Sequence, residues 1–310
     1  MSTLLLTHPV CIEHDTGSFH PECPERLKAV LQALESEEFA FLHRDMAPHA
    51  TTEQMLRAHP MHHIETVFQS IPHSESHHHL DPDTVVSANS GEAALRAAGA
   101  VCAAVDAVAL GQVRNAFCAI RPPGHHAEHD QAMGCCLFNN IVVGALHARA
   151  AHGLQRVAVV DIDVHHGNGT QHMFEEDPGL FYASTHQEHS YPGTGEAHEQ
   201  GVAENIVNVP LPPGSGSADF RAAFSDCILP RLRDFKPDMI MISAGFDAHA
   251  ADPLAHFRLT TGDFGWVTRE ILKVSDEVCN SRVVSALEGG YDLGALAASV
   301  AAHVRALMGS

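Results

Sequence analysis

The alternation of short apolar segments with helical patterns constrains the fold of this chain more than any other feature. Seven segments rich in β-branched residues predict strands, at residues 4–7, 115–120, 156–162, 180–184, 205–209, 238–243 and 282–287. Helical periodicity predicts six helices, at residues 24–36, 91–110, 139–152, 217–235, 262–279 and 293–308. Alternation of this kind favours right-handed crossovers and a parallel sheet with helices on both faces. Because no repeat or long linker divides the chain, we expect one α/β domain over residues 1–310.

Polar clusters follow five of the predicted strands. In chain order they are RPPGHHAEHD, VHHGNG, STH, GFDAHAAD and EGGYD. Ligands of open parallel sheets bind outside the carboxyl ends of the strands. We therefore expect these five clusters to converge on one pocket.

The end of the third predicted strand carries a candidate metal site. Asp161, Asp163 and His165 alternate along the chain, so their side chains are expected on one face. Asp247 is the best candidate for a further ligand. The structural alternative is a salt-bridge cluster, but no basic residue nearby could pair with these carboxylates. Two carboxylates and one imidazole leave a coordination position open, which is the catalytic pattern, and they suit either Zn²⁺ or Fe²⁺.

Two further motifs supply groups for acid–base chemistry. The tandem pair His125–His126 would offer a general base and a general acid beside a metal-bound water, although a surface loop is the plain alternative. Tyr291 follows two glycines and could donate its phenol to an oxyanion, but such a segment is also common in turns. The sequence contains no nucleophile elbow and no phosphate loop. Together these motifs predict metal-assisted hydrolysis of an amide or ester.

Composition excludes several classes of partner. Lys and Arg total 18 against 38 Asp and Glu, a formal net charge of −20, which argues against nucleic acid and anionic membranes. Eight scattered cysteines without a CxxC pair indicate reduced thiols, and the first residues do not resemble a signal peptide. We therefore expect a soluble cytoplasmic protein. The 26 histidines are the reason to look for metal.

Six motifs together resemble the zinc-dependent histone deacetylase superfamily. They are HDTGSFHPECPERL at 14–27, RPPGHHAE at 121–128, DIDVHHGNGTQ at 161–171, YPGTG at 191–195, SAGFDAHAADPL at 243–254 and LEGGYDL at 287–293. Their order and spacing match from about residue 8 to residue 300. The HPE loop and Asn168 are similar to the class II branch and its bacterial amidohydrolase relatives. The resemblance implies the arginase–deacetylase α/β fold.

The resemblance also implies roles for single residues. The implied active site has zinc ligands Asp163, His165 and Asp247, general base His126, its electrostatic and proton-transfer partner His125, transition-state tyrosine Tyr291, and orienting partners Asp161 and Asn168. One implied structural K⁺ site uses Asp161, Ser184 and the carbonyls of Asp163, His165 and Thr185. A second K⁺ site would use the carbonyls of Phe174, Asp177 and Leu180. Arg26 matches an arginine on the presumed acetate exit route.

The expected substrate-binding residues are Gly134, Cys135, Tyr191, Leu254 and Gly289. Cys135 stands where the family has an aromatic channel wall, and Tyr191 supplies the opposite wall. The loss of one ring predicts a wider channel that accepts longer acyl groups or a different amine. Leu254 replaces the Glu of polyamine-specific relatives, which favours acyl-lysine or another neutral amide.

Three functions stay open on this reasoning. The first is deacylation of N-acyl-lysine in a peptide or of a small acylated amine, with an acetylpolyamine as the alternative substrate. The second is a binuclear ureohydrolase of the arginase type, although His249 stands where that fold-mate has an Asp. The third is a catalytically silent acyl-ligand binding module. A homo-oligomer is compatible with each of them.

Overall fold

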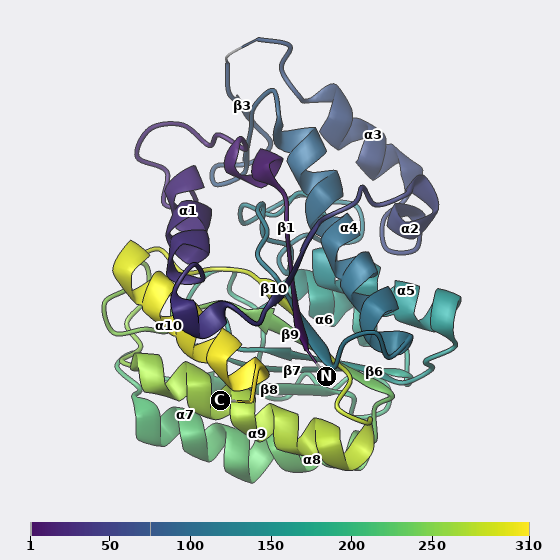
Figure 1. Ribbon diagram of the computed structural model, residues 1–310, viewed down its shortest axis with the longest axis vertical. Helices are drawn as coiled ribbons and strands as arrows, with labels where there is room; N and C mark the ends of the chain where they lie inside the picture. Colours follow the sequence, from purple (N-terminus) through teal and green to yellow (C-terminus); the bar gives the residue numbers. More distant parts are fainter. Residues whose placement is uncertain (1, 75, 310) are drawn as a thin grey trace.

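The computed structural model describes residues 2–74 and 76–309, and within them a parallel sheet of eight strands forms the centre (Figure 1). Every neighbouring pair in this sheet is parallel. In spatial order the strands are β2 (His43–Met46), β1 (Thr3–Thr7), β5 (Asn115–Cys118), β10 (Val283–Leu287), β9 (Met239–Ala244), β6 (Val157–Asp161), β7 (Leu180–Gln187) and β8 (Ile206–Leu211). A separate antiparallel pair joins β3 (His78–His79) to β4 (Val85–Val86).

Helices cover both faces of the sheet and bury two apolar clusters against it. Leu4 and Leu6 of β1 belong to one cluster and Leu5 belongs to the other, as the alternation of a strand requires. The first face carries α2 (Thr52–Leu56), α3 (Met61–Gln69), α4 (Ser90–Ala109), α5 (Asn140–His152) and the short α6 (Asn168–Phe174). The second face carries α1 (Pro24–Ala33), α7 (Ser217–Ala223), α8 (Leu229–Phe235), α9 (Thr261–Val278) and α10 (Leu293–Leu307).

The structure confirms the predicted fold class and each predicted strand, with shifts at the ends. The single helix predicted at residues 217–235 is α7 and α8 joined by a π-helical turn, Phe224–Ile228. The sequence reasoning missed β2, whose four residues are all exposed, so this edge strand carries no apolar alternation to detect. It also missed the very short β3 and β4 and the helices α2, α3 and α6.

Strand register places the predicted polar clusters at one edge of the sheet. Asp161 at the end of β6 is level with Ser184 on β7 and with Ser243 on β9. Ala244 on β9 is level with Leu287 on β10. The loops that leave these strands therefore start side by side. Among the described residues, no helix is long and apolar enough to cross a membrane.

Candidate active site

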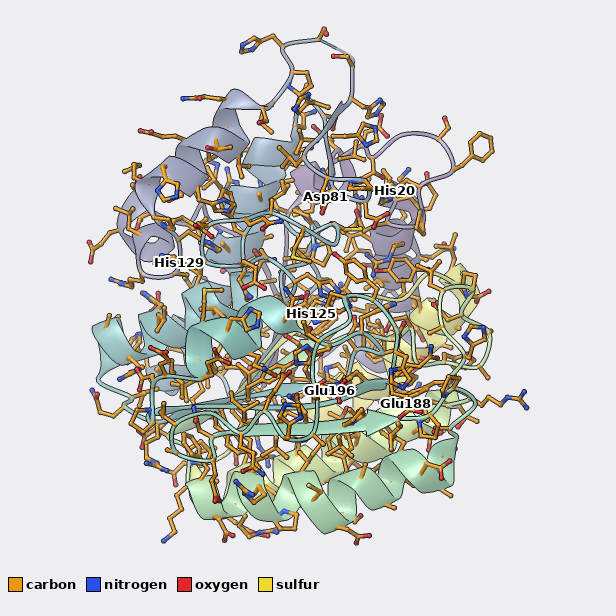
Figure 2. All side chains as sticks on the ribbon, turned by 180° about the vertical axis from the view of Figure 1, so that it is seen from behind. His20, Asp81, His125, His129, Glu188 and Glu196 are labelled. Carbon is orange, nitrogen blue, oxygen red and sulfur yellow. The ribbon has the colours of Figure 1, made fainter. Side chains whose placement is uncertain are left out.

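A cavity of about 590 Å³ opens over the carboxyl ends of the strands. Residues 16–21 and 77–83 contribute to its rim, and His20 from this rim lies above His125 in the view of Figure 2. Seven of the residues that the sequence predicted for the site line this cavity: His126, Gly134, Cys135, His165, Tyr191, Leu254 and Tyr291. Three of the five polar clusters thus reach this cavity, through His126, His165 and Tyr291, as expected from a parallel sheet. Asp247 from a fourth cluster lies beside His165, and none of the described residues 184–186 of the STH cluster lines the cavity.

Asp163, His165 and Asp247 form a compact group that could hold a metal ion, with one ligand atom from each within 4.8 Å of the others. The Nδ1 atom of His165 lies 3.2 Å from Asp163 Oδ1 and 3.0 Å from Asp247 Oδ2. Backbone N–H groups hold the carboxylates in place: that of Gly289 donates to Asp163 Oδ2 (2.9 Å) and that of Val164 to Asp247 Oδ1 (2.9 Å). The three side chains are thus oriented before any ion arrives.

Two glycines leave the space that these carboxylates occupy. A Cβ at Gly245 would lie 2.1 Å from Asp163 Oδ2, and a Cβ at Gly289 would lie 2.3 Å from Asp247 Oδ2. Gly289, predicted to bind substrate, therefore lies against the ligand carboxylates. Burial alone would lower the pKa of His165, but the carboxylates of Asp163 and Asp247 raise this pKa to about 10. The site therefore attracts positive charge. The donor set and the space both fit a divalent cation such as Zn²⁺.

His125 is held by a hydrogen-bonded chain that the sequence predicted only in part. Its Nδ1 lies 2.8 Å from Asp161 Oδ2, and the same oxygen accepts a hydrogen bond from the Tyr182 hydroxyl (3.1 Å). The backbone N–H of His125 donates to Glu288 Oε2 (3.2 Å). Burial alone would lower the pKa of His125, but the carboxylates of Asp161, Asp163 and Glu288 raise it well above its ordinary value. His125 is therefore the cationic member of the pair.

His126 is held in the opposite protonation state. Its Nδ1 lies 2.9 Å from Asn168 Oδ1, while Asn168 Nδ2 donates to the His126 carbonyl (3.2 Å) and to Glu128. Because the Asn168 oxygen faces the ring, Nδ1 of His126 carries the proton and Nε2 keeps a free lone pair. Burial and the neighbouring imidazoles of His125 and His165 lower the pKa of His126 well below its ordinary value. A neutral imidazole with a free Nε2 is suited to act as a base.

Tyr291 lies at the cavity with Arg26 packed behind it. The Arg26 guanidinium carbon lies 5.0 Å from the centroid of the Tyr291 ring. Arg26 donates to the carbonyls of Gly290 (2.6 Å) and Glu288 (2.5 Å) and to Glu22 Oε1 (2.9 Å), and it is fully buried. These bonds hold the EGGY loop in position. Arg26 therefore positions Tyr291, in addition to the role in acetate exit that the resemblance implies.

Three buried residues that support this site were missed from the sequence. Glu22 pairs with both Arg26 and Arg121. Tyr182 donates to the Asp161 carboxylate that contacts the His125 ring, and Glu288 accepts from the His125 backbone N–H. Glu288 immediately follows a strand end, and Glu22 belongs to the HPE motif, so the sequence could have indicated that both residues belong to the site. Tyr182 sits within an apolar strand and had none.

The walls of the cavity agree in part with the predicted substrate channel. The Tyr191 ring lies edge-to-face with that of His126, at 5.1 Å between centroids. Cys135 has a positive φ of 68°, and its Sγ donates to the Asp83 carbonyl (3.3 Å). Leu254 lies at the rim, 43% exposed. The cavity lining therefore includes one aromatic ring, Tyr191, and one small thiol, Cys135.

The two predicted K⁺ sites differ in their structural support. Asp161 at the end of β6 is buried beside Ser184 and Thr185 of β7, and Thr185 Oγ1 has no hydrogen-bond partner among the described residues. In the second predicted site, one amide nitrogen, Asn205 Nδ2, donates to all three carbonyls, those of Phe174 (2.9 Å), Asp177 (3.1 Å) and Leu180 (2.8 Å). These carbonyls already have a partner within the chain, and the second K⁺ site stays a prediction.

The arrangement around Asp247 does not extend to a second metal. His249 Nδ1 accepts from the backbone N–H of Ala251 (3.1 Å), and its Nε2 lies 3.4 Å from the Thr261 hydroxyl. Among the described residues, the candidate metal group in the cavity contains only Asp163, His165 and Asp247. This group offers ligands for one ion, whereas an arginase-type ureohydrolase would need a second metal and further Asp ligands.

Comparisons with known proteins identify the family of this chain. The histone deacetylase domain model matches residues 20–307. Histone deacetylase 14, chloroplastic, of Arabidopsis thaliana is 39% identical over 99% of this chain and 77% of its own length. A histone deacetylase-like amidohydrolase of Pseudomonas aeruginosa is 38% identical over 92% of this chain and 77% of its own length. The crystal structure of the HDA15 HD domain superposes with a TM-score of 0.94 at 35% identity, covering 100% of this chain and 88% of that one. The chain therefore belongs to the histone deacetylase family and is a hydrolase.

Proposed function

We propose that the chain hydrolyses the amide bond of an N-acyl-lysine, or of a related small acylated amine, with Zn²⁺ held by Asp163, His165 and Asp247. The observation that carries this proposal is the candidate metal group beside two adjacent histidines: the neutral His126, which lines the cavity, and the cationic His125, whose ring centroid lies 4.0 Å from that of His126. The family match supports amide hydrolysis as the reaction class.

In this mechanism the protein supplies proton transfer and orientation. When bound, Zn²⁺ would lower the pKa of a coordinated water and polarise the acyl carbonyl. The free Nε2 of His126 accepts a proton from the attacking water. His125, held protonated by Asp161, stabilises the negative charge that develops, and the pair returns a proton to the leaving amine. The Tyr291 hydroxyl donates to the carbonyl oxygen of the substrate as it becomes an oxyanion.

A panel of fluorogenic acyl-lysine substrates tests this assignment directly. We expect His126→Ala to lower kcat by about 10² to 10⁴-fold, the usual contribution of a positioned general base. Tyr291→Phe should lower it by about 10² to 10³-fold, as for other oxyanion donors. His249→Ala is the matched control, because this histidine lies two residues from Asp247 but bonds away from the metal group.

Two results would contradict the proposal. Hydrolysis that survives His126→Ala unchanged would remove the general base from the mechanism. An enzyme that cleaves no acyl amide in the panel, with or without added zinc or ferrous ion, would return the chain to the class of silent binding modules. Elemental analysis of purified protein distinguishes Zn²⁺ from Fe²⁺, both of which suit this donor set.

Cys135 supports a substrate with a larger acyl group than acetyl. A thiol in place of a ring leaves apolar space opposite Tyr191, within the same cavity. We expect Cys135→Phe to lower activity on longer acyl-lysines relative to acetyl-lysine, with Cys135→Ser as the control that keeps the wall small. Unchanged relative rates on acetyl and bulkier acyl substrates would refute the wide-channel hypothesis.

Leu254 supports a neutral amide over an acetylpolyamine. An apolar side chain at the rim offers no partner for the distant ammonium of a polyamine. A preference for acetylspermidine over acetyl-lysine peptides would overturn this choice.

The first K⁺ site, with Asp161, Ser184 and the Asp163, His165 and Thr185 carbonyls, remains part of the proposal. A cytoplasmic location and a homo-oligomer also stay predictions, and two plant relatives are named as chloroplastic.

A further inference from the structure

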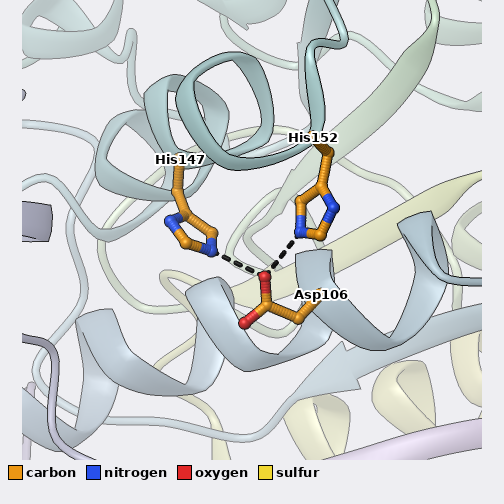
Figure 3. A group of neighbouring side chains, drawn as sticks. All are labelled: Asp106, His147 and His152. Atoms are coloured by element: carbon orange, nitrogen blue, oxygen red, sulfur yellow. Dashed lines mark hydrogen bonds and ion pairs between the residues drawn. The ribbon is translucent and has the colours of Figure 1, made fainter.

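A second group of metal-ligating side chains lies outside the active site, between α4 and α5. Asp106 projects from α4, and His147 and His152 project from α5 toward it (Figure 3). Both imidazoles reach the same carboxylate oxygen: Asp106 Oδ1 lies 2.7 Å from His147 Nε2 and 2.6 Å from His152 Nε2. One ligand atom from each residue lies within 4.8 Å of the others.

We propose that Asp106, His147 and His152 bind a second divalent transition-metal ion, of the Zn²⁺ class, independent of the catalytic one. Two imidazoles and one carboxylate are a typical donor set for such ions. Three protein ligands would leave a position for water. Because α5 carries this group at its carboxyl end and follows the active-site loop at its amino end, the ion would clamp α4 to α5 and take no part in catalysis.

The surroundings allow an ion to enter and the ligands to adjust. The Asp106 side chain is 45% exposed, whereas those of His147 and His152 are 8% and 15% exposed. Asp106 also lines an open cavity of about 400 Å³ beside β1 and β2. Its carboxylate can therefore withdraw toward the cavity and make room for an ion between the three ligand atoms. Zinc–nitrogen and zinc–oxygen distances of about 2.0–2.2 Å require only this small separation.

Arg57 holds His147 in the tautomer that cannot bind a metal ion through Nε2. Its guanidinium donates to His147 Nδ1 (2.8 Å), so in the metal-free state His147 carries its proton on Nε2 and donates it to Asp106. Ligation through Nε2 requires the other tautomer, with the proton on Nδ1 and the Arg57 bond broken. Arg57 keeps a second partner in Glu53, 2.8 Å away, so it can release His147 without losing all its hydrogen bonds. His152 Nδ1 has no partner among the described residues and is free to change tautomer.

The test counts zinc bound by the folded, full-length protein after equilibrium dialysis against Zn²⁺, using elemental analysis. We expect His152→Ala and Asp106→Asn each to bind one zinc fewer per chain than the wild type, with acyl-lysine hydrolysis unchanged. His49→Ala is the matched control, because His49 pairs with a single carboxylate, Glu92, in a similar exposed hydrogen bond (2.6 Å). It should keep the wild-type zinc count.

Arg57→Met supplies an independent arm. Because it frees His147 Nδ1, we expect the second zinc to bind about tenfold more tightly, the equivalent of one hydrogen bond to a charged group. A zinc count that falls in neither His152→Ala nor Asp106→Asn, or that falls equally in His49→Ala, would overturn the proposal. Unchanged zinc affinity in Arg57→Met would overturn ligation through His147. Both experiments measure zinc binding, as a difference of one ion per chain or as a change in affinity. They can therefore be interpreted even if the proposed catalytic activity is not found.

Discussion

Several histidines of this chain are buried without charge, and His303 allows the sharpest prediction about them. It is fully buried on α10, with Nδ1 2.7 Å from the Thr268 hydroxyl and Nε2 2.8 Å from the Ser285 hydroxyl. Burial lowers the pKa of His303 to about 3, and no carboxylate opposes it. The folded protein therefore keeps this ring neutral at a pH where the unfolded chain protonates it.

The consequence is a loss of stability on acidification whose size follows from linkage. The pKa of His303 is about 3 when folded, against 6.5 for a free histidine side chain. A depressed histidine pKa makes the unfolded state bind more protons, so stability falls as pH drops below 6.5 and levels off below 3. Between pH 7.5 and pH 5.0 this one residue should remove about 2 kcal/mol of unfolding free energy. The value hardly depends on the folded pKa, because pH 5.0 lies far above it.

Urea unfolding of the wild type and His303→Gln at both pH values measures this quantity. The absolute stability of the variant will be lower, but its change between pH 7.5 and pH 5.0 should be smaller than that of the wild type by about 2 kcal/mol. His43→Gln, on the exposed edge strand β2, should keep the wild-type dependence. A difference between the two pH dependences of less than about 0.5 kcal/mol would show that the ring is not held neutral by burial.

Three further predictions concern buried groups around the site. Tyr182→Phe removes the hydroxyl that donates to Asp161, and steady-state kinetics should show kcat about tenfold lower with KM unchanged; a change in KM alone would contradict a positioning role. Glu22→Gln leaves Arg121 buried with a weakened partner, and denaturant unfolding should show a loss of about 3–5 kcal/mol; a loss below about 1 kcal/mol would contradict the buried pairing. Asn205→Ala removes the amide that donates to the carbonyls of Phe174, Asp177 and Leu180, of which the first two keep a backbone N–H donor, and it should lower the Tm, with K⁺ restoring more of it than Na⁺. Equal effects of the two ions on this variant and the wild type would show that the carbonyls do not form a latent cation site.

The second metal group changes how metal counts should be interpreted. One metal per chain would support a mononuclear deacylase, and two would ordinarily favour a binuclear ureohydrolase. Occupation of the group around Asp106 would give a count of two in a mononuclear enzyme. The metal count of the His152→Ala variant separates these alternatives, because this substitution removes a ligand only from the group around Asp106.

The histidine count illustrates what composition can and cannot locate. Twenty-six histidines suggested metal chemistry, but few of them belong to the site. Others, such as His59 and His303, are buried neutral rings, and burial lowers the pKa of each to about 3. Strand-end positions found the site because parallel strands bring their carboxyl ends to one edge, whereas residue counts carry no position.

By itself, the sequence determined the sheet class, the strand ends that converge, and the residue types available for metal binding and proton transfer. Those features depend on local periodicity and on chain order, which a linear pattern records. Only the tertiary structure decided that His125 is cationic and His126 neutral, because the carboxylate of Asp161 approaches from β6 and the amide of Asn168 from α6. It likewise brought Asp106 to two histidines more than 40 residues away, a contact that exists only because α4 and α5 pack side by side. Protonation, tautomer and ligand grouping are set by such distant neighbours, and their distances are properties of the folded chain.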